Sequence, residues 1–229
     1  MFDPHSAAAF TRLEGSAYVR FSVLALSSIF FLVDPFAALP TFLAVTAGQS
    51  PERRKRTARK ASLTALIVLT TFVFVGQYIF RVFGITLPAF EISGGIILLL
   101  IGLDMLEAKR SPTQESPSEA EAAATKDDAG IVPMGIPMLA GPGSITTVMV
   151  LVGQAQTRWQ VIAILGAIAI TAAVCWAVLG SAARVAAVMG DTGIRILVRI
   201  MGLLLVALAV QYFVNGFVDL GVLTRPASY

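Results

Sequence analysis

Six apolar runs dominate this chain, and each is long enough to cross a bilayer as a helix. A hydrocarbon core of about 30 Å needs about 20 helical residues per crossing. The runs lack the strict alternation of barrel strands, and backbone amides cannot stay unpaired in lipid, so we expect each run to be helical. They cover residues 17–47, 61–80, 85–106, 131–153, 159–183 and 194–220. The sequence therefore predicts an all-α integral membrane protein with six transmembrane helices.

The composition also favours lipid as the solvent. Hydrophobic residues make up 56% of the chain and charged residues only 14%, whereas soluble domains are about 25% charged. The formal net charge of +3 does not indicate a nucleic-acid partner, because the basic residues cluster beside apolar runs and do not alternate with aromatic ones. We expect one transmembrane domain, residues 1–229, and no nucleic-acid partner.

Histidine and cysteine are too rare for most enzyme chemistry. His5 precedes the first run and Cys175 lies inside the fifth, and each is the single residue of its type. The runs therefore contain no histidine for a proton relay or a Ser-His pair, and no metal cluster or nucleophile-base pair is evident. We expect no catalytic residue, no metal, no cofactor and no enzymatic activity.

The distribution of Lys and Arg predicts the orientation. Most of the 17 basic residues fall in the first, third and fifth connections between runs. The positive-inside rule places these connections in the cytoplasm, with both termini outside it. The first connection holds the densest cluster, from Arg53 to Lys60, and this cluster could bind anionic lipid. The alternative is that it only determines topology. Ser50 and Pro51 precede it and read as the N-cap and first residue of a helix.

Residues 107–130 interrupt the apolar pattern. They are rich in Glu, Ser, Pro, Ala and Asp, and they contain no aromatic or long aliphatic side chain. Such a composition cannot bury enough apolar surface to order itself. We therefore predict a flexible cytoplasmic linker between a first three-helix unit, residues 17–106, and a second, residues 131–220.

The two units align with a shift of 107 residues. Asp34-Pro35 then falls on Gly141-Pro142, and Gly95 falls on Gly202. Because each unit holds an odd number of helices, the second must insert upside down relative to the first. The sequence therefore predicts a 3+3 inverted repeat, which is an architecture of secondary transporters.

Prolines interrupt the first run of each unit. Pro35 and Pro40 lie in the first run, and Pro133, Pro137 and Pro142 lie in the fourth. Proline removes an amide donor and clashes with the preceding turn, so both helices should break. Broken helices expose amides and carbonyls that can hold a substrate. The alternative is that the prolines only kink packed helices.

The predicted substrate site lies between these interruptions. Asp34 would take the ammonium group of a substrate or a coupling cation, or alternatively would only cap the broken helix. The start of the second broken helix would offer amides and hydroxyls to an anion. Glu91 is a second ion-coupling candidate, although an acid in the first turn after Pro88 can be favourable for helix-dipole reasons alone. The other predicted substrate-binding residues are Pro35, Phe36, Thr41, Gly94, Gly95, Gly141, Pro142, Gly143, Ser144, Thr146 and Thr147.

Three stretches, residues 34–40, 83–96 and 132–147, together resemble the MarC family of bacterial and archaeal inner-membrane proteins, which includes SnatA-type neutral amino-acid transporters. The resemblance implies a six-helix protein of the inner membrane, with transport of glycine or alanine attributed to some members. Many relatives have glycine two positions after the first proline, where this chain has Ala37.

These observations lead to two hypotheses. The first is a secondary transporter of small neutral amino acids that works by alternating access. The second is a non-transporting membrane scaffold or assembly partner, in which the prolines are architectural. Faces of small residues would permit a homo-oligomer in either case.

Overall fold

The computed structural model describes residues 4–107, 130–132 and 134–224, and their regular structure is entirely helical. The predicted linker falls outside this range, apart from Glu107 and Gly130, as does Pro133. The elements are α1 (Pro4–Val33), α2 (Leu39–Val45), α3 (Pro51–Phe83), α4 (Leu87–Leu106), η1 (Met134–Leu139), α6 (Pro142–Gln154), α7 (Arg158–Gly180) and α8 (Ala182–Asp219).

Four of these helices are long and apolar enough to cross a membrane. They are α3, α4, α7 and the part of α8 from Thr192 to Asp219, and they match the second, third, fifth and sixth predicted runs. The first and fourth runs are instead divided into shorter pieces, and Ala17–Val33 is the apolar helix of the first. Helix α8 begins at Ala182 but is kinked at Gly190, where φ is 63°, and its apolar part after the kink agrees with the sixth predicted run.

Local capping explains where α3 and α4 begin. The Ser50 hydroxyl accepts the amide of Arg53 at 3.3 Å, with Pro51 as the first helical residue, which confirms the predicted helix start. Gly84 then ends α3 in the left-handed region, with φ of 65°. Thr86 caps α4, so this helix begins at Leu87, within the predicted run of residues 85–106.

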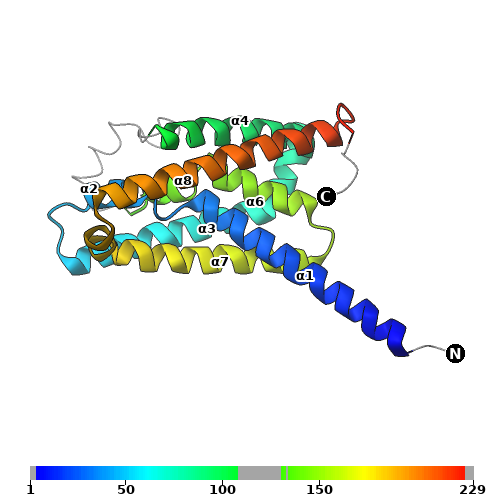
Figure 1. The fold of residues 1–229 in the computed structure, drawn as a ribbon, viewed down its shortest axis with the longest axis horizontal. Helices are drawn as coiled ribbons and strands as arrows, with labels where there is room; N and C mark the ends of the chain where they lie inside the picture. Colours follow the sequence, from blue (N-terminus) through cyan, green and yellow to red (C-terminus); the bar gives the residue numbers. More distant parts are fainter. Residues whose placement is uncertain (1–3, 108–129, 133, 225–229) are drawn as a thin grey trace.

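The helices form one bundle in which α4 runs along α8, and α7 packs against α3 and α1 (Figure 1). Helix α6 lies between these groups and contacts α1, α3 and α4. The α4–α8 crossing is antiparallel and close: a Cβ on Gly95 would lie 3.0 Å from the Ala209 carbonyl oxygen, and one on Gly102 would lie 3.0 Å from that of Gly202. Large apolar side chains such as Phe74 and Leu203 face outward, as expected of surfaces in lipid.

The basic segments lie at one end of the bundle, opposite the start of α1 and the end of α8 (Figure 1). Helices α3 and α8 begin, and α4 and α7 end, at the left of Figure 1. Helix α1 begins and α8 ends at the opposite side of the same view. The cluster from Arg53 to Lys60 and the start of α8 with Arg184 therefore share one end of the bundle, which we call the basic end.

Candidate functional site

The first interruption separates α1 from α2. Helix α1 ends at Val33, and Asp34 takes φ of +39°, a backbone conformation that residues other than glycine, asparagine and aspartate seldom adopt. The Asp34 Oδ1 accepts the amide of Ala37 at 3.1 Å and so fixes the turn. Helix α2 begins at Leu39, with Pro40 near its start, where a missing amide is tolerated.

The second interruption precedes α6. The π-helical segment η1 contains Ile136 with extended backbone angles, φ −133° and ψ 130°. Gly141 then forms an extended N-cap and Pro142 begins α6. A Cβ on Gly141 would clash with the Pro137 carbonyl oxygen, so this turn requires glycine. Both proline-containing runs are therefore interrupted where the sequence predicted.

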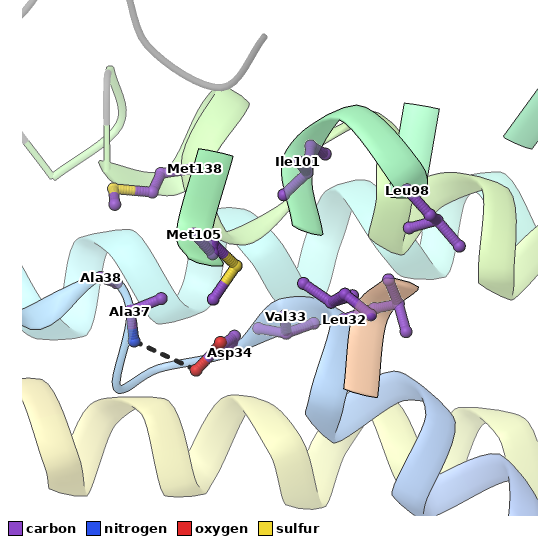
Figure 2. A pocket seen from close by; sticks show the side chains of 10 residues that line it. Leu32, Val33, Asp34, Ala37, Ala38, Leu98, Ile101, Met105 and Met138 are labelled. Carbon is purple, nitrogen blue, oxygen red and sulfur yellow. Dashed lines mark hydrogen bonds between the residues drawn. The ribbon is translucent and has the colours of Figure 1, made fainter. Parts of the chain in front are cut away.

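The two interruptions border the same small cavity (Figure 2). Asp34, Ala37 and Ala38 contribute from the first interruption and Met138 from the second. Helix α4 covers the cavity with Leu98, Ile101 and Met105, and the remaining wall is made by Leu32, Val33 and Leu205. It therefore lies beside the second half of α4, toward the basic end. Its volume is about 10 Å³, which is room for about one water molecule.

Asp34 is the single ionisable residue in the lining of this cavity. Its side chain is 6% exposed, and Figure 2 shows it beside Ala37, below Met105 in that view. The cap uses only Oδ1, and Oδ2 is buried without a hydrogen-bond partner. Leaving such an oxygen unpaired costs about 1–3 kcal/mol or more for a charged group. Asp34 is thus a structural cap that retains one oxygen for another donor.

The start of α6 lies behind the wall of the cavity and not in its lining. A Cβ on Gly143 would come within 2.8 Å of Leu98 Cδ2. The Ser144 hydroxyl donates to the carbonyl oxygens of Leu139 and Gly141, at 2.9 and 3.1 Å. Thr147 Oγ1 accepts the Tyr212 hydroxyl at 3.0 Å. These hydroxyls, predicted to face substrate, are therefore directed to neighbouring helix groups in this conformation.

None of the remaining predicted residues lines the cavity. The Phe36 ring meets the edge of Phe30 with centroids 6.4 Å apart. Thr41 is buried in α2, and Gly95 faces Ala209 and Phe213 of α8. A Cβ on Gly94 would overlap the Thr146 methyl group, so α4 and α6 approach closely there. Pro35 is buried within the turn that follows Asp34.

Glu91 belongs to a second buried polar group. It lies beyond the first turn of α4, which contains no acid, so the position predicted from the helix dipole was wrong. Its side chain is fully buried, with Oε1 accepting Gln154 Nε2 at 2.9 Å and Oε2 left without a partner. Seven residues of α4, about 10 Å of helix, separate Glu91 from Leu98, the nearest residue of this helix that lines the cavity. The sequence did not reveal Gln154 or Tyr212, because neither occurs in a recognisable pattern.

No group of three or more His, Cys, Asp or Glu residues with metal-binding geometry occurs in the described part of the chain. The candidate site is therefore a cavity with one buried carboxylate. Such a site can bind a cation or an ammonium group.

An all-helical bundle with lipid-facing apolar surfaces defines an integral membrane protein. The family described as MarC family integral membrane protein matches residues 19–220. The chain belongs to this MarC family.

Its relatives are similar over most of their length. A UPF0056 membrane protein of Methanocaldococcus jannaschii is 40% identical over 86% of this chain and 96% of its own length. A UPF0056 membrane protein of Aquifex aeolicus is 37% identical over 86% and 92%. The UPF0056 membrane protein YhcE of Escherichia coli is 33% identical over 90% and 94%. No solved structure matches the chain significantly.

Proposed function

We propose that this protein is a secondary transporter of small neutral amino acids, of the glycine and alanine class, that works by alternating access. The observation that carries the proposal is the unpaired Oδ2 of Asp34, buried at a cavity bordered by both interrupted segments. A buried carboxylate oxygen is a suitable partner for the ammonium group of an amino acid or for a coupling cation.

The walls of the cavity fit a small apolar substrate. They carry Leu, Val, Ile, Ala and Met side chains, with Asp34 as the charged exception. The first turn of α6, at Gly143, lies directly behind Leu98. A modest shift of α4 against α6 would expose the backbone amides of the first turn of α6. These amides could then bind a substrate carboxylate, because a helix N-terminus favours an anion. The volume of about 10 Å³ corresponds to an occluded state that must widen to admit substrate.

The α4–α8 contacts support an inverted repeat of units 17–106 and 131–220. Gly95 meets Ala209, and Gly102 meets Gly202. The shift of 107 residues that relates the two units maps Gly95 onto Gly202 and Gly102 onto Ala209. It therefore exchanges the Gly95–Ala209 contact with the Gly102–Gly202 contact. A two-fold axis between α4 and α8 requires this exchange. The alternating-access mechanism would use two units related in this way, rocking against each other.

Glu91 is the proposed coupling residue, because it is fully buried and retains one unpaired oxygen beside Gln154. Because Glu91 does not line the Asp34 cavity, the coupling ion and the substrate would bind at separate sites. We further propose an inner-membrane location with both termini outside the cytoplasm, since the basic end would then face the cytoplasm.

Uptake of radiolabelled glycine and alanine into proteoliposomes tests the proposal. We expect flux above that of empty liposomes, and a decrease of at least tenfold in Asp34→Asn. Asparagine tolerates the left-handed backbone and retains the cap to Ala37, so this variant should fold. Asp104→Asn removes the same charge outside the cavity and should transport normally. Flux equal to empty liposomes for all small neutral amino acids would refute the function and favour a non-transporting scaffold.

A further inference from the structure

A basic groove opens at the basic end of the bundle, where the start of α3 meets the junction of α7 and α8. Its volume is about 530 Å³. Arg54 and Lys55 of α3 line one side, and Arg184 of α8 lines the other, with Gly180 and Ser181 between them. Three cations from helices far apart in the sequence therefore converge on one space.

The charge of this groove is not balanced by its own lining. None of the residues that line it is acidic. The Arg54 Nε is buried without a hydrogen-bond partner. A guanidinium donates to phosphate oxygens in a bidentate manner, and lysine adds a compact charge. The groove is therefore complementary to a phosphate group.

An apolar groove of about 280 Å³ continues from the basic one along α3 and α7. Trp176 lines both grooves and so connects them. Leu63 and Leu66 of α3 and three alanines of α7 make up most of its lining, to which Arg59 and Ser62 of α3 add two polar side chains. Trp176 is 52% exposed and Leu63 47%, so this groove opens toward the lipid side of the bundle.

We propose that the two grooves together bind one anionic phospholipid. The phosphate lies among Arg54, Lys55 and Arg184, and an acyl chain lies along Trp176 and Leu66. A soluble phosphate compound would bind only in the basic groove. A phospholipid would place its headgroup in the basic groove and an acyl chain in the adjoining apolar groove. Basic pockets between helices at the cytoplasmic surface are suited to anionic headgroups. This lipid site is separate from the Asp34 cavity and does not depend on the transport function.

Lipid binding to the purified full-length chain in detergent tests this proposal. Phosphatidylglycerol should raise the melting temperature, while phosphatidylcholine and inorganic phosphate should change it much less. The Arg54→Gln/Arg184→Gln variant should bind phosphatidylglycerol on the order of thirtyfold more weakly, from the loss of two cations. Arg158→Gln, which changes a basic residue at the opposite end, should bind it normally. Trp176→Ala should weaken phosphatidylglycerol binding without affecting the response to phosphate.

Three results would overturn the proposal. The first is an equal response to phosphatidylcholine, which would indicate non-specific lipid contact. The second is an equal response to inorganic phosphate, which would indicate a simple anion site. The third is unchanged binding in the double variant. If that variant does not fold, Lys55→Gln alone makes the same test, with an expected loss of about fivefold.

Discussion

The close approach of α4 to α6 gives a quantitative test of the packing behind the cavity. An added Cβ at Gly94 would overlap the Thr146 methyl group and would lie 3.2 Å from the Thr146 Cβ. Both residues lie inside helices, so neither backbone can yield without shifting α6 against α4. Overpacking of this kind costs about 1–3 kcal/mol. Because the new Cβ would overlap a methyl group, the upper part of this range applies, about 2–3 kcal/mol. Alanine gains about 1 kcal/mol over glycine from helix propensity, so we expect Gly94→Ala to be destabilised by about 1–2 kcal/mol.

A double-mutant cycle isolates this contact. Thr146→Ser removes the overlapping methyl and keeps the hydroxyl, so it should restore most of the stability lost in Gly94→Ala. The coupling free energy should fall in the range of about 0.5–3 kcal/mol that contacting residues show. Gly166→Ala in α7 is the matched control, since its new Cβ has nothing within 4 Å. The assay is reversible unfolding in mixed detergent micelles. The predicted contact would be refuted if Gly94→Ala unfolds with the same free energy as the unsubstituted protein. It would also be refuted if Thr146→Ser does not restore the stability lost in Gly94→Ala.

Three further predictions follow from other parts of the structure. Gln154→Leu removes the donor to Oε1 of the buried Glu91 and leaves both of its oxygens unpaired, so unfolding in detergent should show a loss of about 1–3 kcal/mol. In a Glu91→Leu background, which has no acceptor for this bond, the same Gln154 change should cost much less, and full additivity would contradict the pair. Asp34→Ala loses the cap to Ala37 and keeps an unfavourable φ of +39°, so it should be less stable than Asp34→Asn by about 1–2 kcal/mol, and equal stability would mean that the cap is unimportant. A C-terminal alkaline phosphatase fusion should be active and a green fluorescent protein fusion dark in a bacterial host; the opposite pattern would reverse the proposed orientation.

The sequence predicted the interruptions of the first and fourth runs because proline acts locally. Pro35 and Pro142 limit the backbone wherever they occur, and no tertiary information is needed to place the resulting breaks. Ser50 and Pro51 predicted the start of α3 for the same reason. Local sequence signals therefore predicted the two interruptions, the start of α3 and the place of Asp34 at the first interruption.

Contacts between helices could not be predicted from the same patterns. The Glu91–Gln154 bond joins residues that lie 63 positions apart, and the Thr147–Tyr212 bond spans 65. Each depends on the rotation and register of packed helices, which an almost uniformly apolar sequence does not encode by periodicity. The direction of the Ser144 hydroxyl, toward Leu139 and Gly141, likewise depends on the shape of the turn before α6.

Cysteine protection at the cavity tests the central claim most directly. Ala37→Cys and Met138→Cys, each in a Cys175→Ala background, place a thiol on the two interrupted segments, and Gly166→Cys on the outer face of α7 serves as the control. We predict that saturating alanine or glycine slows the labelling of both cavity thiols in membrane vesicles and leaves the control unchanged. If neither amino acid alters labelling at positions 37 and 138 while both variants remain folded, the two interruptions do not enclose a substrate site.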